Sequence, residues 1–500
     1  MIDTKLIAAV KDLAGKRPVF RLSELMPSPG ESADDCAPVE IFAIIKPHLR
    51  KLGLTAVKSG GDYMISRRGP PPALPTVEDA PGPHEAFFAE RRIPPAIEQA
   101  IEEYITKKAG RSWDDPATLD KLRKAIVAQK DDYWRPAQKR ALRYAKGYSV
   151  LSYLAYHFPV YFVQAEHLLA MLARDGLLRP SMNILDVGTG PGVFPLATAD
   201  FYARAGRGKA AVYSIERSEE HREAFLFLRE RCTATGGAAS LKPPIAMDIL
   251  NPDLGKVPGK IGLMVFSNVL NELPGGDTES ASRVVTQFAE RLAPDGSILI
   301  TEPADEENAT RMRLLTAALA KQGFSIFSPC SFLWGTTCDA PRCWSFTGAS
   351  PIHRTRLMEL LAQDPEGFRY ANTDIKYSYA VLRKDGLTKH GCRLPADAKY
   401  LRFGKLPLHV GKRISVAAAK MSGELGNSSS HVLKLCDGTA KVPVYTVIPS
   451  YHLTPENRLI TEAPYGTVLE LKGVLVRYNK EHNAFNLLVN RNTTVERPEA

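Results

Sequence analysis

Cysteine is scarce in this chain: the 500 residues include 7 cysteines, too few and too unevenly spaced for a disulfide-stabilised secreted scaffold. Long apolar runs are also missing. The longest apolar region, residues 150–173, is interrupted by polar residues such as His157 and Glu166, so it predicts a buried helix pair and not a membrane span. The first residues include Asp3 and Lys5 without an apolar signal core, which favours a cytoplasmic location.

The overall composition is that of a large globular protein. Hydrophobic residues make up 44% and charged residues 24% of the chain, and a chain of this length is typical of about three domains. The formal net charge of +10 indicates a polyanionic partner. Nucleic acid is the favoured partner, and no membrane is expected, because no segment is apolar enough to enter one.

The most informative segment is a glycine-rich turn that follows a predicted buried strand. Residues 183–187 read Asn-Ile-Leu-Asp-Val, an apolar strand with Asp186 near its carboxyl end. Gly188, Gly190 and Gly192 follow at every second position, and glycine lets the backbone turn sharply and approach a ligand closely. Open α/β sheets bind ligands at the carboxyl ends of their strands, so the segment predicts a nucleotide site. An ordinary tight turn is the alternative.

Further strands with polar tips follow in the order of an α/β sheet. The next predicted strand, residues 211–215, ends in Glu216, which lies 24 residues after Gly192, close to the spacing at which an acidic side chain binds a ribose hydroxyl. The later predicted strands are residues 244–247, ending in Asp248; 261–266, ending in Ser267 and Asn268; 296–300, ending in Glu302; and the closing pair 324–327 and 377–382. Taken singly, Asp248 and Glu302 are also typical of helix caps.

The spacing of the glycines distinguishes this turn from a dinucleotide-binding turn. It reads D-x-G-x-G-x-G and not G-x-G-x-x-G, and in this form it resembles motif I of the S-adenosylmethionine-dependent methyltransferases. The resemblance implies a seven-stranded Rossmann-like α/β methyltransferase domain over residues 181–390, with an adenine contact at Asp248. The cofactor-binding residues that it implies are Asp186, Gly188, Gly190, Gly192, Glu216, Asp248 and Asn268.

Three of the cysteines lie in one predicted loop, residues 329–346. They are Cys330, Cys338 and Cys343, with gaps of seven and four residues between them. Cytosolic thiols stay reduced, so a cluster of this kind indicates a metal centre. A four-coordinate site needs one more ligand, for which Cys392 and Cys436 are both candidates. Cys36 and Cys232 lie in or beside predicted helices, where packing in a core is the favoured interpretation.

Taken in order along the chain, these motifs resemble a known family. Besides the glycine turn and the cysteine loop, the resemblance rests on residues 267–273, Cys343 to Phe346, Lys376 to Tyr379 and residues 433–438. Together they resemble the methyltransferase-like assembly factors of the mitochondrial small ribosomal subunit and their bacterial and archaeal relatives, over about residues 95–440. The resemblance implies small-subunit rRNA and ribosomal proteins as partners. It also implies a 4Fe-4S iron-sulfur cluster held by Cys330, Cys338, Cys343 and Cys436.

The chain departs from that family's pattern at the cysteines. The gap after Cys330 is longer and lacks the usual Pro-His, and a longer insertion precedes Cys436. Cys392 therefore remains an alternative fourth ligand. Zinc remains an alternative metal, because tetrahedral thiolate sites suit either.

The amino-terminal flank predicts a small nucleic-acid module. Residues 1–68 combine two helices with a hairpin, a pattern typical of a winged helix, and a protein-contact module is the alternative. The second helix carries the basic residues Lys46, Arg50 and Lys51. After it, a proline-rich linker is expected over residues 69–94 and a helical subdomain over residues 95–180.

The carboxyl-terminal flank, residues 400–495, predicts five short strands with one more helical link, which resembles an OB-fold β-barrel. Residues 401–500 contain 13 Lys or Arg against 8 Asp or Glu, interleaved with Tyr445, Tyr478 and Phe485. Basic residues beside stacking aromatics suit single-stranded RNA. Packing of the same aromatics inside the barrel is the alternative.

The sequence assigns no catalytic residue. Enzymes of this fold that methylate base amines carry Asn or Asp followed by two prolines and an aromatic residue after the fourth strand, where this chain has Asn-Val-Leu-Asn at residues 268–271. Asn268, Asn271 and Glu272 are the polar candidates there, and capping of the next helix is the favoured interpretation. An rRNA methyltransferase and a non-catalytic RNA-binding assembly factor therefore both remain open, and a tRNA or DNA methyltransferase with a zinc site is less favoured.

Overall fold

The computed structural model describes most of the chain. The described residues are 2–16, 19–25, 38–49, 52, 54–59, 62–67, 83–133, 147–205, 208–232, 237–273, 276–334, 338, 343–389, 394 and 399–498.

The amino-terminal module packs two helices on a small sheet. Its elements are α1 (Ile2–Lys16), β1 (Val19–Arg21), η1 (Leu22–Leu25), α2 (Pro38–Leu49), β2 (Leu54–Ser59) and β3 (Asp62–Arg67). The sheet order is β1-β3-β2, antiparallel throughout. Ile41 and Ile45 are buried because they recur at helical spacing on the face of α2 that meets the sheet. Lys46 is exposed on α2, Arg50 and Lys51 lie outside the described residues, and the winged helix stays a prediction.

Between the amino-terminal module and the central sheet, the described residues form five helices. They are α3 (Pro83–Ala89), α4 (Pro95–Ala109), α5 (Pro116–Tyr133), α6 (Tyr148–Tyr156) and α7 (Phe158–Arg174). Helix α3 lies in the segment that the sequence predicts to be a linker. It packs on the rest of the domain through Phe87, which is buried and whose ring centroid lies 4.5 Å from that of Phe201. The predicted buried pair is α6 and α7. No helix in the described part of the chain has the length and apolar character needed to cross a bilayer.

A central mixed sheet forms the core of the chain. Its strands are β4 (Ser181–Val187), β5 (Lys209–Glu216), β6 (Ala239–Leu241), β7 (Ile245–Ala246), β8 (Ile261–Ser267), β9 (Leu292–Pro303), β10 (Ser325–Ser328), β11 (Thr347–Ala349) and β12 (Ile375–Arg383). The main path runs β10-β12-β9-β8-β4-β5-β6, with β12 antiparallel to both of its neighbours on that path. Strand order reverses at β4, which creates a topological switch point.

The described residues give nine strands in this sheet where the sequence predicts seven. Strand β11 pairs with β12, and the strand expected at residues 244–247 is the two-residue β7, which pairs with β5 beyond β6. Pro243 and Pro244 separate β6 from β7, because proline has no N–H to donate to a ladder.

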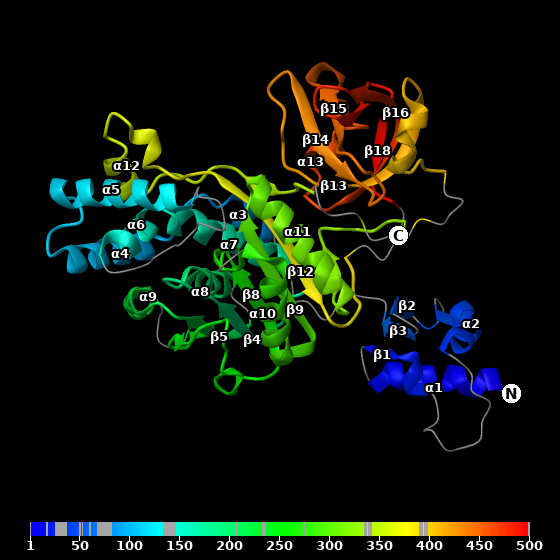
Figure 1. Cartoon of the computed structure of the whole chain (residues 1–500), viewed down its shortest axis with the longest axis horizontal. Helices are drawn as coiled ribbons and strands as arrows, with labels where there is room; N and C mark the ends of the chain where they lie inside the picture. The colour runs from blue at the N-terminus through cyan, green and yellow to red at the C-terminus, as the bar shows by residue number, and fades with distance from the viewer. Residues whose placement is uncertain are drawn as a thin grey trace.

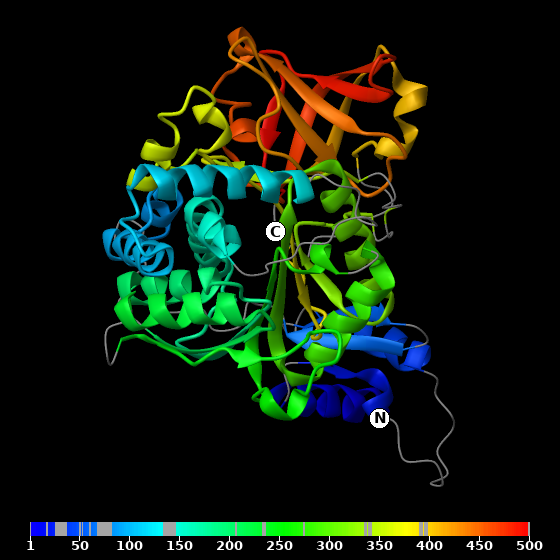
Figure 2. The same cartoon turned by 60° about the vertical axis from the view of Figure 1, so that its left-hand side comes forward.

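Helices cover both faces of the sheet (Figure 2). They are α8 (Val193–Ala205), α9 (Glu219–Cys232), α10 (Thr278–Phe288), α11 (Glu306–Lys321) and the short α12 (Arg356–Leu361). Side chains alternate along β4, so Ile184 packs toward the core formed by α7, α8 and α9, whereas Leu185 and Val187 pack toward the core formed by α10 and α11. The apolar strand is therefore buried on both faces, as its continuous apolar run predicts.

The carboxyl-terminal domain is a closed barrel of five strands. Its elements are η8 (Phe403–His409), β13 (Arg413–Lys420), β14 (Ser430–Cys436), β15 (Val444–Pro449), α13 (Leu459–Glu462), β16 (Val468–Asn479), β17 (Ala484–Leu488) and β18 (Thr494–Glu496). The order β13-β14-β15-β17-β16 closes by pairing of β13 with β16, and β18 adds to β16. Strands β15 and β17 run parallel, so the barrel is not a simple meander. The predicted barrel is confirmed.

The barrel lies against the domain of the central sheet, beside α11 (Figure 1). Lys434 and Tyr445 face each other on β14 and β15. The Lys434 ammonium donates to the backbone carbonyl of Trp344, near the end of the cysteine loop. The Trp334 indole donates to Asp437 at 3.2 Å. The outer face of β14 and β15 is therefore partly covered by the neighbouring domain.

Candidate functional site

The three glycines of the turn after β4 have different surroundings: two are closely packed and one borders open space. All three have positive φ: 78° at Gly188, 55° at Gly190 and 86° at Gly192. A Cβ at Gly188 would lie 2.3 Å from Val269, and one at Gly192 would lie 2.1 Å from Phe225, so these two glycines permit close packing. A Cβ at Gly190 would have no neighbour closer than 3.8 Å. The middle glycine therefore borders open space.

That space is a cavity of about 930 Å³ at the switch point of the sheet. The cavity is lined by the glycine turn, the tips of β5 and β8 and the segment after β7. Helices α4, α5, α6, α7 and α9 also contribute side chains to its wall. The lining residues that the sequence proposes are Gly188, Gly190, Glu216, Asp248 and Asn268. Asp186 and Gly192 lie beneath the turn and do not line the cavity.

Asp186 is a buried carboxyl group with an unsatisfied oxygen. Its side chain is 2% exposed, and Oδ1 has no hydrogen-bond partner. Burial raises the pKa of Asp186 to about 7, the Thr189 hydroxyl acts against this rise, and the charge of Glu216 adds to it. A buried polar atom without a partner is costly, and this carboxyl group lies inside the protein and not on the cavity wall.

Glu216 connects the glycine turn to the tip of β5. Its Oε2 accepts from the Gly190 N–H at 2.9 Å, and its Oε1 accepts from the Ser218 N–H at 2.7 Å. Burial raises the pKa of Glu216, whereas these two N–H groups act to lower it. The carboxylate therefore fixes the turn in place while it borders the cavity.

Asp248 and Asn268 lie at the two other sides of the cavity. Asp248 is exposed, and its Oδ1 accepts from the Leu250 N–H at 3.0 Å. Asn268 has φ 52°, and its Oδ1 is buried without a partner. Both positions suit a polar ligand group, and Asn268 offers an unused acceptor.

The capping role expected for Asn268, Asn271 and Glu272 is wrong. Helix α10 begins at Thr278 and is capped by Asp277, whose side chain accepts from the Ser280 N–H at 2.6 Å. The short helix η4 (Leu270–Glu272) comes between, so the polar residues lie too early in the chain to reach α10.

A wall of aromatic and histidine side chains, which the sequence does not predict, also lines the cavity. It consists of Tyr153 and His157 from α6 and its end, Tyr161 from α7 and His221 from α9. The His157 and Tyr161 rings stack at 5.5 Å with 18° between their planes. Burial lowers the pKa of His157 to about 4, so this imidazole is neutral at physiological pH. The only sequence signal was the interruption of an apolar run by polar residues.

The cysteines from two distant segments lie within electrostatic reach of one another. Burial raises the pKa of Cys436, at the end of β14, and the charges of Cys343 and Cys330 raise it further. Burial also raises the pKa of Cys330 to about 12, with Cys338 among the contributing neighbours. Within the part of the chain that the structure describes, no group of three or more His, Cys, Asp or Glu residues has metal-binding geometry. Cys392 and Cys36 lie outside that part.

The aromatic residues of the barrel have different surroundings. Phe485 is 6% exposed and packs in the barrel core, so it is not a stacking platform. Burial raises the pKa of Tyr445, which lies near Glu306 of α11. Tyr478 is 42% exposed, with exposed Arg477 beside it. Of the three predicted aromatics, Tyr478 best fits a nucleic-acid surface.

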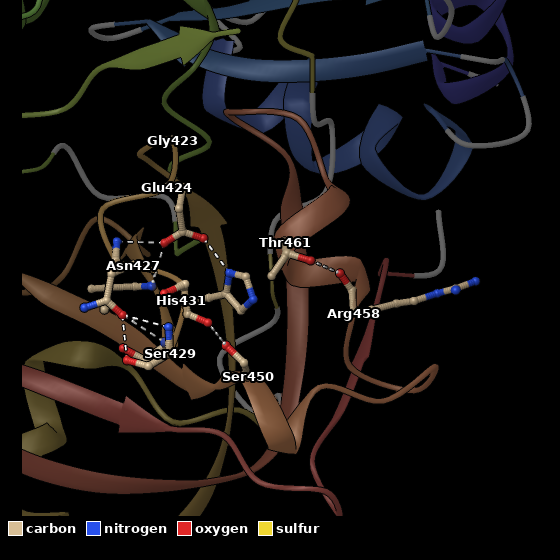
Figure 3. A network of polar contacts seen from close by, with 12 residues as sticks. Gly423, Glu424, Asn427, Ser429, His431, Ser450, Arg458 and Thr461 are labelled. Carbon is tan, nitrogen blue, oxygen red and sulfur yellow. Dashed lines mark hydrogen bonds and ion pairs between the residues drawn. The ribbon is translucent and has the colours of Figure 1, made fainter.

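The turn between β13 and β14 is held by its own polar side chains. Glu424 accepts from the Val432 N–H at 2.8 Å and contacts His431 Nδ1 at 2.8 Å. Asn427 accepts from the Ser429 N–H at 2.9 Å. Figure 3 shows Glu424 and His431 facing each other, whereas the side chain of Arg458 points away from the turn. These hydrogen bonds order the turn between β13 and β14.

Two parts of the chain match family models. Residues 159–334 match the model of a methyltransferase domain. Residues 404–498 match the C-terminal domain of a domain of unknown function, DUF8157. No curated protein matches the chain.

Solved methyltransferase structures resemble the chain at low identity. Magnesium protoporphyrin IX methyltransferase from Synechocystis PCC 6803 with bound SAH is 16% identical, with a TM-score of 0.28, over 53% of this chain and 99% of its own. A SAM-dependent methyltransferase from Leishmania major is 15% identical, with a TM-score of 0.29, over 56% of this chain and 90% of its own. Ribosomal protein L11 methylase from Lactobacillus delbrueckii subsp. bulgaricus is 16% identical, with a TM-score of 0.25, over 44% of this chain and 80% of its own.

The family match covers the glycine turn, β4 to β10, and two of the helices that line the cavity, α7 and α9, whereas α4, α5 and α6 lie before it. Residues 159–334 therefore have a class I, S-adenosylmethionine-dependent methyltransferase-like fold, and a β-barrel follows the sheet.

Proposed function

We propose that the chain binds S-adenosylmethionine in the cavity at the switch point, through Asp186, Gly188, Gly190, Glu216, Asp248 and Asn268, with Gly192 supporting the turn. The observation that carries this proposal is the open space beside Gly190, in a cavity that Glu216 and Asn268 line from the tips of two strands. Glu216 and Asp248 offer acceptors for ribose hydroxyls and the adenine amine at two sides of the same cavity. When bound, the cofactor would supply an electrophilic methyl group.

The pH dependence of binding tests the role of Asp186. S-adenosylmethionine carries an ammonium and a sulfonium group, so it favours the ionised carboxylate. Because the pKa of Asp186 is about 7 in the ligand-free protein, we expect affinity to rise as the pH increases through that value, and Asp186→Asn to lose this dependence. Titrations of both proteins with S-adenosylmethionine at about one pH unit below and above the pKa of Asp186 measure this dependence. Equal pH dependence in both proteins would contradict the assignment.

The same shift has a consequence for stability. The native carboxyl holds its proton more tightly than the unfolded chain between the ordinary pKa of 3.8 and about 7. The ligand-free protein therefore loses stability from this group as the pH rises through that window. Asp186→Asn should flatten that part of the stability profile, measured by urea unfolding.

The proposed macromolecular partner is the rRNA of the small ribosomal subunit, together with ribosomal proteins, in the cytoplasm. The family resemblance and the net charge of +10 support it. The described cysteines form no disulfide, which suits a reducing compartment. The aromatic wall of Tyr153, His157 and Tyr161 suits a planar acceptor beside the cofactor. A tRNA or DNA acceptor, with zinc in place of the cluster, is a less favoured proposal.

Two proposals differ in whether a methyl group is transferred. Asn268 supplies an acceptor at the tip of β8, but the proline and aromatic residues of amine-methylating enzymes do not follow it. Incubation of immature small subunits with methyl-tritiated cofactor separates the alternatives. Label in rRNA supports an rRNA methyltransferase. Subunit binding without label supports a non-catalytic assembly factor whose folding or timing responds to the cofactor.

RNA binding by the barrel predicts a steep salt dependence. Each single-strand phosphate contact contributes about 0.7 to the slope of log affinity against log salt. Replacing exposed Arg477 and Lys480, which flank Tyr478, by alanine should lower that slope by about 1.4 if both bind phosphate. Filter binding of a single-stranded RNA oligonucleotide measures it.

Lys124 and Lys256 provide the matched control for the barrel variant. Both are exposed lysines outside the barrel, with 76% and 62% of their side chains accessible. Their joint replacement by alanine removes the same total charge. An equal loss of slope in the two double variants would indicate non-specific attraction and would contradict an RNA site on the barrel.

The proposed metal ligands are Cys330, Cys338, Cys343 and Cys436, holding a 4Fe-4S cluster, with zinc as the alternative and Cys392 as the alternative fourth ligand. Thiolates are ligands that suit zinc or an iron-sulfur cluster, although the described residues as placed form no metal-binding group. When bound, the metal would join the two domains.

A further inference from the structure

Three of the rings that line the cavity form one continuous group. Tyr153, His157 and Tyr161 all belong to the cavity wall. The Tyr153 ring centroid lies 5.3 Å from that of His157 and 6.3 Å from that of Tyr161, and the His157 and Tyr161 rings stack at 5.5 Å. None of the three is among the residues proposed to bind the cofactor, so these rings can face the methyl acceptor.

The rings carry no charge at physiological pH. Burial lowers the pKa of His157 to about 4, and the ammonium of Lys130 adds to the fall. Burial also lowers to about 4 the pKa of His221, whose ring lies 5.8 Å from that of Tyr153. The pKa of Tyr153 and that of Tyr161 are raised by burial, so both phenols keep their protons. This part of the wall therefore presents neutral π faces, which attract cations.

The charged residues of the cavity wall are mostly carboxylates. Among the described residues that line the cavity, the acidic ones are Glu216, Glu219, Glu220, Glu223, Asp248 and Glu272, and the basic ones are Lys108 and Arg217. The Lys108 ammonium lies 2.7 Å from a Glu223 oxygen, so its charge is already compensated. A chain with a net charge of +10 therefore has a negatively charged cavity.

Glu272 brings one of these carboxylates to the aromatic part of the wall. It ends η4, shortly after the tip of β8, and is half-buried in the lining of the cavity. After burial, the charge of Glu272 contributes to the raised pKa of Tyr161 and of Tyr153, which fits a position near both rings. Glu216 and Asp248 are assigned to the cofactor, so Glu272 is the carboxylate placed for a second ligand.

We propose that the methyl acceptor is an aliphatic ammonium group, held by the Glu272 carboxylate against the faces of Tyr153 and Tyr161. This rests on the proposed cofactor site and names the class of substrate that the same cavity takes. A lysine side chain or amino terminus of a ribosomal protein carries such a group, and so does a free polyamine. The rRNA is then a docking surface and not the acceptor, because a wall of carboxylates repels the phosphates beside a nucleotide base.

Glu272 also supplies the base that the transfer needs. The ammonium gives one proton to the Glu272 carboxylate, and the freed lone pair on nitrogen forms a bond to the methyl carbon. The carbon–sulfur bond breaks with its electron pair on sulfur, which leaves a methylammonium group and S-adenosylhomocysteine. The proton then passes from Glu272 to solvent. Glutamine at this position keeps the size of the side chain but accepts no proton.

Labelling of immature small subunits with methyl-tritiated cofactor tests the acceptor class when the rRNA and protein fractions are counted separately. A parallel reaction offers spermidine, a free aliphatic amine. We expect acid-stable label in protein, on lysine or an amino terminus. Label in spermidine alone would also support an aliphatic ammonium and would identify a free polyamine as its source. Label in rRNA would overturn the inference.

Variants of the full-length protein test the two parts of the acceptor site. We expect Glu272→Gln to lower kcat/KM for the amine by about 100-fold or more, as for loss of a general base, with unchanged affinity for S-adenosylhomocysteine. Tyr161→Phe keeps the π face and should stay close to wild type, whereas Tyr161→Leu should lose about tenfold. Glu230→Gln is the matched control, because it removes an exposed carboxylate of α9 that does not line the cavity.

The outcomes separate this inference from the cofactor proposal. Binding of S-adenosylhomocysteine without label in protein or spermidine would overturn the acceptor class alone, and so would wild-type activity in folded Glu272→Gln. Intact protein that binds no S-adenosylhomocysteine would overturn both proposals.

Discussion

Replacement of Cys343 or Cys436 by serine is expected to remove the metal and destabilise the protein at once. Cys343 belongs to the loop between β10 and β11 of the central sheet and Cys436 ends a barrel strand, so a shared metal would link two domains. Structural zinc sites contribute about 10 kcal/mol or more in small peptides. We therefore expect the free energy of unfolding to fall by several kcal/mol, measured by denaturant titration beside iron and zinc content.

Cys232 is the control for this pair of variants. It lies at the end of α9, partly buried, with Sγ 3.8 Å from the Ala96 carbonyl. Cys232→Ser should keep both metal and stability. A brown protein that bleaches in air would identify the iron-sulfur cluster, and a colourless zinc protein would favour the alternative. Full metal content in Cys436→Ser together with loss of metal in Cys392→Ser would show that Cys392, and not Cys436, is the fourth ligand.

The Gly190→Ala variant is expected to lose most of its cofactor affinity. A methyl group at this position enters the space beside the glycine turn, where the nearest atom is 3.8 Å away, so it meets the ligand before it meets the protein. The φ of 55° adds a conformational cost of about 1 kcal/mol. We expect affinity for S-adenosylmethionine to fall by more than about tenfold, or 1.4 kcal/mol, measured by equilibrium dialysis.

Gly110 separates the effect of strain from the effect of blocking the cavity. It ends α4 with φ 67°, and a Cβ there would have no neighbour within 4 Å. Gly110→Ala should therefore lower stability about as much as Gly190→Ala while leaving cofactor binding unchanged. Equal affinity in both variants would contradict the placement of the cofactor beside Gly190.

The parts of the fold that local sequence determines were predictable. The continuous apolar run of β4 and the glycine spacing after it follow from burial on both faces and from the need for positive φ. The closed barrel followed from its short alternating strands. The division into β6 and β7 was missed, although Pro243 and Pro244 mark the break, because an edge strand of three residues carries little periodic signal.

The remaining features depend on contacts between distant segments. Helix α3 forms because Phe87 meets Phe201, and no local pattern reveals that contact. The aromatic wall needs three helices to converge on one cavity. Arg313 of α11 occupies an ordinary position in a helical pattern, and it is buried only because α11 packs against β12 and the barrel.

Calorimetric titration of the intact protein with S-adenosylhomocysteine tests the central claim most directly, because this ligand occupies the cofactor site without transferring a methyl group. The account predicts saturable heat at one ligand per chain, with affinity reduced in Gly190→Ala and Asp186→Asn. No heat at high micromolar ligand, from protein whose circular dichroism shows an intact fold, would contradict it.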